Sequence, residues 1–298
     1  MALRPKLGFA LGSGSARGWA HVGVLRALAE QGFVPDFVAG CSIGALVGAA
    51  FAAGRIDLLE TWVRSLDPRR VFGLLDIGWG GGLIKGERVI DFFREQIVQC
   101  GFADLPIQFA AVATDAASGQ EVWLREGRVS EAVQASIAVP GLFRPVLREG
   151  RYLMDGSLVN PIPVSLCRAM GADIVIAVDL GSDLVGRHNR ENHRKHEAQA
   201  ARRPFISRLL PRHGDELDPP GNSAAPPTLL ETVMGAIDIM QVRIARGRLD
   251  SEQPDVLLAP RLGHLGLLDY HRADEAIAEG REAVARMLPE LRSAWPDQ

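Results

Sequence analysis

The feature that most constrains this chain is the pentapeptide Gly40-Cys41-Ser42-Ile43-Gly44, a GxSxG sequence between two apolar segments. Residues 36–39 before it predict a short buried strand, and residues 45–53 after it predict a helix. The chain must therefore turn sharply at Ser42. Flanking glycines such as Gly40 and Gly44 permit such a turn, and the turn exposes a serine side chain near the positive end of a helix. The motif favours a nucleophilic serine, with a tight structural turn as the alternative.

Strands and helices alternate along the chain. Residues 7–11 predict a strand, residues 17–31 a helix, residues 36–41 a second strand and residues 43–53 a second helix. Such βαβ units form a mainly parallel sheet that is covered by helices on both faces, so the fold class is α/β. Further strands are expected at 107–114, 120–124, 173–180 and 255–260, and further helices at 85–99, 228–249 and 272–288.

One segment, residues 184–227, interrupts this alternation. It has little apolar periodicity and two Pro-Pro pairs, so we expect a flexible insertion within a single domain that spans residues 1–298. Four histidines lie in it, but no acidic or cysteine ligands stand at supporting spacing, which favours a solvated basic loop over a metal site. A further interpretation is peripheral contact with an anionic membrane through its basic residues, Arg187, Arg190, Arg194, Lys195, Arg202 and Arg203.

Composition excludes several classes of protein. The chain has 298 residues, of which 47% are hydrophobic and 23% charged, as in a soluble globular protein, and its net charge of -3 does not indicate a nucleic-acid partner. The weakly polar run 38–54 fits a buried strand and helix better than a membrane span, and the apolar run after the basic start breaks at Gly12, unlike a signal peptide. Neither a disulfide framework nor a zinc site is suggested by the three cysteines, so a cytoplasmic location is expected.

A glycine-rich loop, residues 12–18 (GSGSARG), follows the first predicted strand and opens the first predicted helix. Backbone N–H groups in such a loop can bind an anion. A dinucleotide site would use the same geometry, but Arg17 stands where the third glycine of GxGxxG belongs, and no acidic ribose partner ends the second strand. The loop is therefore better suited to stabilising the oxyanion of an acyl-transfer reaction.

A third motif, Asp155-Gly156-Ser157, by itself indicates no more than a turn. Combined with the loop and the serine motif, however, the chain resembles the patatin-like phospholipase family, and is most similar to its small single-domain bacterial branch. The resemblance lies in residues 12–32 (GSGSARGWAHVGVLRALAEQG), 38–48 (VAGCSIGALVG), 135–146 (ASIAVPGLFRPV) and 154–180. It implies a three-layer α/β/α sandwich.

The resemblance also implies roles for particular residues. Ser42 would be the nucleophile and Asp155 the general base of a Ser-Asp dyad that needs no histidine, metal or cofactor. The oxyanion hole would be formed at Gly14, Ser15 and Arg17. The motif glycines are Gly12, Gly18, Gly40, Gly44 and Gly156.

Two departures from the family pattern concern serines. Ser13 and Ser15 stand where the family has glycines, which leaves the backbone N–H groups in place but alters the shape of the loop. Ser157 stands where the motif ends in alanine or glycine. Its hydroxyl could donate a hydrogen bond to Asp155 and lower the basicity of that carboxylate, whose ordinary pKa of about 3.9 already makes it a weak base unless burial raises it.

The activity implied is hydrolysis of fatty-acyl esters through an acyl-enzyme on Ser42, with the lipid class left open among phospholipid, lysophospholipid, glyceride and thioester. One alternative is a Ser-acid-His triad with His264 or His271, although the nucleophile of α/β-hydrolases follows several strands and Ser42 follows only the second. Another is a catalytically weak regulatory or membrane-associated protein with the same fold, against which the intact Ser42 and Asp155 argue. His21 is expected to pack near the site without a catalytic role.

Overall fold

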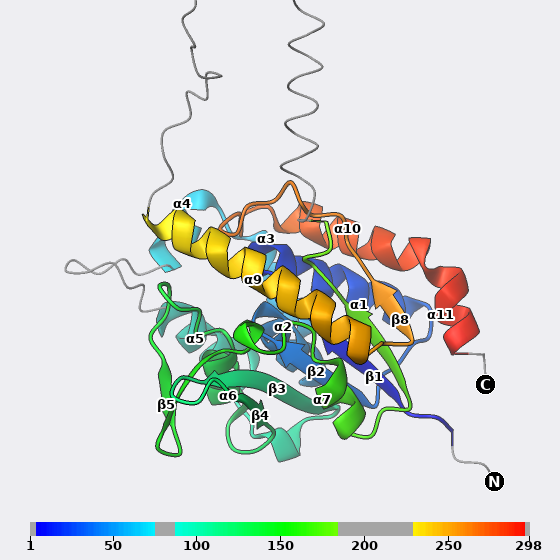
Figure 1. The fold of residues 1–298 in the computed structure, drawn as a ribbon. Helices are drawn as coiled ribbons and strands as arrows, with labels where there is room; N and C mark the ends of the chain where they lie inside the picture. The colour runs from blue at the N-terminus through cyan, green and yellow to red at the C-terminus, as the bar shows by residue number, and fades with distance from the viewer. Residues whose placement is uncertain (1–3, 75–86, 184–228, 296–298) are drawn as a thin grey trace, which may run out of the picture.

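A computed structural model of the protein describes residues 4–74, 87–183 and 229–295 (Figure 1). Its centre is an eight-stranded sheet of order β5-β6-β3-β2-β1-β7-β8, in which β4 also pairs with β3. The strands are β1 Leu7–Leu11, β2 Phe37–Cys41, β3 Gln108–Asp115, β4 Glu121–Leu124, β5 Val146–Arg148, β6 Arg151–Asp155, β7 Ile174–Val178 and β8 Val256–Leu258. Neighbouring strands are parallel along the order β3-β2-β1-β7-β8, whereas β4, β5 and β6 form an antiparallel margin. The α/β class is confirmed.

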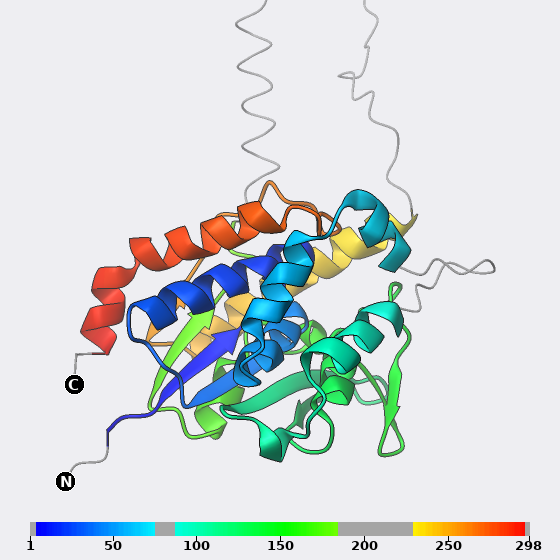
Figure 2. The same cartoon turned by 180° about the vertical axis from the view of Figure 1, so that it is seen from behind.

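Helices cover both faces of the sheet. In Figure 1, α7 and α9 lie in front of the strands, and Figure 2 shows α1, α3 and α10 on the opposite face. The α-helices are α1 Ala20–Glu30, α2 Ile43–Ala52, α3 Ile56–Arg64, α4 Pro68–Leu74, α5 Glu87–Phe92, α6 Val129–Ser136, α7 Val164–Ala169, α9 Leu229–Ser251, α10 Ala273–Arg286 and α11 Leu288–Ala294. Shorter helical turns are η1 Ser15–Trp19, η2 Phe93–Ile97, η3 Phe102–Asp104 and η4 Gly156–Leu158. This is the expected three-layer sandwich.

In β1 the two faces of the sheet carry side chains of different size. In β1, Leu7, Phe9 and Leu11 belong to the larger core, which includes residues of α1, α2 and α10. Ala10, between them, belongs to a smaller core that it shares with α7. Alternation along a strand directs successive side chains to opposite faces, so small residues let α7 approach closely while large ones fill the thicker layer.

The pairing of β3 places the predicted nucleophile beside the predicted base. Val112 pairs with Cys41 of β2, and the next residue, Ala113, pairs with Asp155 of β6. At both positions β4 occupies the other edge of β3. Strands β2 and β6 therefore follow one another along the same edge of β3. Ser42, directly after Cys41, reaches Asp155 through this register.

The predicted helices are present and differ from the described ones mainly at their ends, whereas α3, α4, α6, α7, β5 and β6 were not predicted. The helix expected at 17–31 is the 3-10 turn η1 followed by α1, which ends at Glu30. The helix expected at 85–99 is α5 followed by a π-helical turn. The helix expected at 272–288 ends at Arg286, and α11 then begins at Leu288.

The segment expected to be a flexible insertion, residues 184–227, lies outside the described residues, as do its histidines and basic residues. None of the described helices combines the length and the hydrophobicity that crossing a lipid bilayer requires.

Candidate active site

Ser42 and Asp155 meet in the structure. The Oγ of Ser42 donates a hydrogen bond to Oδ2 of Asp155 at 2.6 Å. Asp155 has no exposed surface, and Ser42 keeps 7% of its surface exposed. A hydroxyl bonded to a buried carboxylate can lose its proton to that carboxylate as it attacks an electrophile, which is the geometry of an activated serine.

The turn at Ser42 is strained. Its φ of 54° and ψ of -125° lie outside the regions that residues with a Cβ prefer. The flanking glycines serve this turn by leaving space: a Cβ at Gly40 would lie 2.5 Å from Cα of Ala45, and one at Gly44 would lie 2.2 Å from the carbonyl oxygen of Leu11. The start of α2 therefore packs directly against the end of β1, and this packing brings the serine beside the loop that follows β1.

The other three motif glycines are also at close approaches, and a Cβ at Gly12 would lie 2.5 Å from the carbonyl oxygen of Val178. A Cβ at Gly156 would lie 2.4 Å from the carbonyl oxygen of Val112, and one at Gly18 would lie 2.2 Å from the side chain of Ile43. Any larger residue at either position would push the base or the glycine-rich loop away from the nucleophile.

Hydrogen bonds to its backbone and to its carboxylate hold Asp155 in position. Its N–H donates to the carbonyl of Ala138 at 3.0 Å, its carbonyl accepts from Oγ1 of Thr114 at 2.7 Å, and its Oδ1 accepts from the N–H of Ser157 at 2.8 Å. Burial raises the pKa of Asp155 to about 6, against the lowering effect of hydrogen bonds from Ser157 and Ser42. The carboxylate is therefore a stronger base than an exposed aspartate, yet it remains ionised at neutral pH.

The glycine-rich loop supplies free donors, but not all those expected. The N–H of Arg17 donates to the carbonyl of Gly14 at 3.1 Å, and the N–H of Ala16 donates to Leu267 at 3.2 Å. Within the described residues the N–H groups of Gly14 and Ser15 make no hydrogen bond. Of the three predicted oxyanion positions, Gly14 and Ser15 thus have available N–H groups, whereas that of Arg17 is occupied.

Arg17 has a different place in the site. Its side chain is 2% exposed, donates from Nε to the carbonyl of Gly14 at 3.2 Å and forms an ion pair with Asp238 of α9 at 2.9 Å. The side chain therefore connects the loop to the helix that crosses above it.

An apolar cavity opens at Ser42. One of its walls is aromatic: the ring of Trp62 stacks on Phe92 with centroids 4.6 Å apart and meets the edge of Trp19 at 6.2 Å. The apolar residues that line the cavity are Trp19, Ile43, Leu46, Trp62, Leu66, Val71, Val89, Ile137, Val139, Leu142, Phe143, Ile237 and Leu267. Polar groups enter at Ser15, Ser42, Asp238, Gln241 and Tyr270. Such a lining suits a hydrocarbon chain held with one end at the serine.

The described histidines do not contact the dyad. His21 is buried and donates from Nε2 to the carbonyl of Gly12 at 2.7 Å, and burial lowers its pKa to about 4, so the ring is neutral and holds the glycine-rich loop. His264 bonds to Glu275 at the surface, and His271 is exposed. Among the described residues, therefore, no histidine forms the hydrogen bond to Ser42 that the triad alternative requires.

Metal ligands do not gather in the described part of the chain. No group of three or more His, Cys, Asp or Glu side chains there is arranged to hold a metal ion.

Three residues of the site were not found from the sequence. Ser136, at the end of α6, accepts the N–H of Ser42 at 2.9 Å. Gln241 of α9 contacts the serines of two motifs. Ile43 begins α2, and its N–H has no partner within the described residues. Only Ile43 had a signal in the sequence, because the residue after a GxSxG nucleophile commonly donates to the oxyanion.

Comparisons with known proteins agree with the motifs. The sequence profile described as Patatin-like phospholipase matches residues 9–168. An NTE family protein of Mycobacterium bovis is 33% identical over 95% of this chain and 91% of its own length. A patatin-like phospholipase domain-containing protein of Caenorhabditis elegans is 34% identical over 59% of this chain and 14% of its own length.

Among solved structures, VipD from Legionella pneumophila gives a TM-score of 0.40 at 14% identity and covers 97% of this chain and 77% of its own. The assignment rests on the sequence matches, which extend across both the serine motif and the Asp-Gly-Ser motif. The chain belongs to the patatin-like phospholipase family.

Proposed function

We propose that this protein hydrolyses fatty-acyl esters with a Ser-Asp dyad. The observation that carries the proposal is the 2.6 Å hydrogen bond from Ser42 to the fully buried Asp155, at a strained turn that opens onto an apolar cavity. Membership of the patatin-like phospholipase family supports lipid ester hydrolysis in general, and the dyad gives it a mechanism.

In the first half of the reaction, Oγ of Ser42 attacks the ester carbonyl while its proton passes to Oδ2 of Asp155. The C=O double bond becomes a single bond to an oxyanion. When the tetrahedral intermediate collapses, the C–O bond to the alcohol breaks and the leaving oxygen takes the proton from Asp155. An acyl group then remains on Ser42.

In the second half, water replaces the alcohol. The oxygen of the water attacks the acyl carbonyl while Asp155 accepts a proton from that water. The new tetrahedral intermediate then collapses by breaking the bond between the acyl carbon and Oγ. Ser42 regains the proton from Asp155, and the fatty acid leaves. A carboxylate with a pKa of about 6 can perform both transfers at neutral pH, since it is mostly ionised before each attack.

The negative charge of the intermediates needs donors on the side of the carbonyl away from Asp155. The N–H groups of Gly14 and Ser15, together with that of Ile43 at the start of α2, are the free candidates among the described residues. Each such donor contributes about 3 kcal/mol to stabilisation of the transition state. Arg17 supports these donors by holding the Gly14 carbonyl and Asp238.

The cavity indicates the part of the substrate that is recognised. Its side chains can remove an acyl chain from water, and they offer few partners for a polar headgroup near Ser42. We infer that the acyl chain is the main determinant of binding. Peripheral contact with an anionic membrane remains a prediction for residues 184–227.

Active-site labelling tests the proposal. A fluorophosphonate should label the wild-type protein at Ser42, and peptide mapping should place the adduct on that residue. Ser42→Ala should not be labelled, whereas His264→Ala and His271→Ala should be labelled as fast as wild type. A folded protein that reacts with neither the fluorophosphonate nor any acyl ester would support the weakly catalytic regulatory alternative, and loss of labelling in a histidine variant would support a triad.

A further inference from the structure

Gln241, on the face of α9 that lines the cavity, joins two of the sequence motifs. Its Nε2 donates to Oγ of Ser157 at 2.7 Å, and its Oε1 accepts from Oγ of Ser13 at 3.3 Å. Ser13 belongs to the glycine-rich loop and Ser157 to the motif that carries the base. A single amide therefore connects the glycine-rich loop to the motif that carries Asp155.

The bond to Ser157 constrains where that hydroxyl can send its proton. A serine hydroxyl has one proton and two lone pairs. Because one lone pair accepts from Gln241, the proton must point to another acceptor. The carboxylate of Asp155 is the neighbouring acceptor, because it already accepts the N–H of the same serine, and the Ser157 side chain is among the causes that lower the pKa of Asp155.

We propose that Gln241 is a positioning residue for the catalytic base: its amide orients the Ser157 hydroxyl toward Asp155 and at the same time holds the loop that carries the oxyanion donors. The inference rests on the proposed function, because it assigns Asp155 the role of base. It also gives a physical role to Ser157, the position at which this chain departs from the alanine or glycine of its family.

The other titratable groups around Asp155 are either neutral or paired with an opposite charge. Cys41 and Tyr270 interact electrostatically with Asp155, and burial raises the pKa of both, so both are neutral at neutral pH. Arg17, near Tyr270, is paired with Asp238, and Glu121 of β4, which interacts with Cys41, is paired with Arg248 at 3.2 Å. His21 is neutral in its buried position.

The pH dependence of kcat/KM tests the proposal. Hydrolysis of a soluble ester, p-nitrophenyl butyrate, should be measured from about pH 4.5 to about pH 8.5. Wild type should show an acid limb, where protonation of Asp155 stops catalysis. In Ser157→Ala and in Gln241→Met, which keeps the side-chain length without the amide, the limb should move to higher pH by about 0.5 unit or more. Gln241→Glu should move it further, because its carboxylate attracts the Ser157 proton and adds negative charge.

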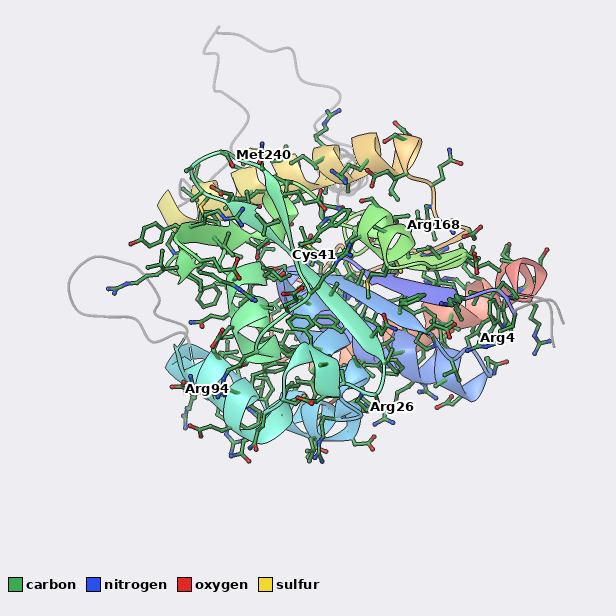
Figure 3. The ribbon with its side chains drawn as sticks, turned by 90° about the horizontal axis from the view of Figure 1, so that it is seen from below. Arg4, Arg26, Cys41, Arg94, Arg168 and Met240 are labelled. Carbon is green, nitrogen blue, oxygen red and sulfur yellow. The ribbon has the colours of Figure 1, made fainter. Side chains whose placement is uncertain are left out.

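A double variant at Ser157 and Gln241 distinguishes orientation of the Ser157 hydroxyl from a general disturbance of the site. If Gln241 acts through Ser157, Ser157→Ala combined with Gln241→Met should have the same acid limb as Ser157→Ala alone. Met240 is the matched control: it neighbours Gln241 on α9 but is 48% exposed, and Figure 3 labels it together with Cys41, the residue before the nucleophile. Met240→Ala should leave the profile unchanged.

Two results would overturn the proposal while leaving the proposed function intact: an acid limb of Gln241→Met that coincides with that of wild type, or shifts of the two single variants that add in the double variant. Full activity of Ser42→Ala would instead refute the dyad. The two failures are thus distinguishable.

Discussion

The guanidinium of Arg17 meets the carboxylate of Asp238 at 2.9 Å, although the two residues are 221 positions apart in the chain. The arginine is almost fully buried, and the aspartate side chain is 24% exposed. Because Arg17 also holds the carbonyl of Gly14, the pair connects α9 to the loop that presents the free N–H groups. The position of these N–H groups therefore depends on a helix that contains neither the GxSxG motif nor the Asp-Gly-Ser motif.

We expect Arg17→Met to weaken both folding and catalysis. It leaves Asp238 partly buried without its partner, which should lower the free energy of unfolding by about 2 kcal/mol. Displacement of the loop should lower kcat about tenfold. Urea unfolding and ester hydrolysis measure the two effects. The control is Arg94→Ala, labelled in Figure 3, because both members of the Arg94–Asp91 pair are 49% exposed and such pairs contribute little. Equal losses in both variants would contradict a special role for Arg17.

Ser42→Ala and Ser42→Gly should both be inactive but should differ in stability. Either change removes the nucleophilic oxygen, so turnover of a p-nitrophenyl ester should fall below about 1% of wild type. Glycine accepts a φ of 54°, whereas alanine keeps the strain, so Ser42→Gly should be more stable by about 1 kcal/mol. Chemical denaturation gives the difference. An alanine variant as stable as the glycine variant would show that the turn stores no strain.

Asp155→Asn should be inactive and should gain stability relative to wild type as pH rises. The folded-state pKa is raised to about 6 from 3.8, so the folded protein resists ionisation of Asp155. Below pH about 4 the carboxyl group is protonated in both the folded and the unfolded state, so it does not change the free energy of unfolding. Between about pH 4 and pH 6 the free energy of unfolding of the wild type falls by up to about 3 kcal/mol, whereas that of the amide variant does not. Unfolding of both proteins across this range measures the difference. A difference that does not change with pH would contradict the raised pKa.

The aromatic wall of the cavity should set the preference for acyl-chain length. Trp62→Ala removes a large ring from the lining, so relative kcat/KM should increase for long-chain p-nitrophenyl esters. Val71→Phe places a larger side chain in the same cavity and leaves less room for substrate. It should selectively reduce hydrolysis of long-chain esters while sparing p-nitrophenyl acetate. Val34→Ala, at a residue that is 64% exposed, serves as control. If the chain-length profile were the same in all four proteins, the acyl chain would bind elsewhere.

Much of the fold was predictable because its signals are local. The buried strands β1, β2 and β7 are short apolar runs in the sequence. The β3–β4 hairpin is marked by its turn at 117–119. Ser42 and Asp155 could be singled out because both lie in short motifs, and the 2.6 Å hydrogen bond shows that these motifs meet.

Contacts of α9 were not predictable in this way. Gln241 and Asp238 carry no motif, and each bonds to residues far away in the sequence, so only the packing of α9 across the site reveals them. Helices α3 and α4, which provide part of the cavity wall, were also missed. Whether the N–H of Arg17 is free or hydrogen-bonded depends on whether the loop leads into an α-helix or a 3-10 turn. The glycine-rich sequence does not decide between the two.

The shared edge of β3 has a consequence for how activity appears during folding. Ser42 and Asp155, 113 positions apart, come together only when β2 and β6 have both docked on that strand. Neither docking event alone creates a reactive serine. The return of fluorophosphonate reactivity after dilution from denaturant should therefore report completion of this one part of the sheet, and partly folded chains that lack it would carry no hydrolytic activity into the cell.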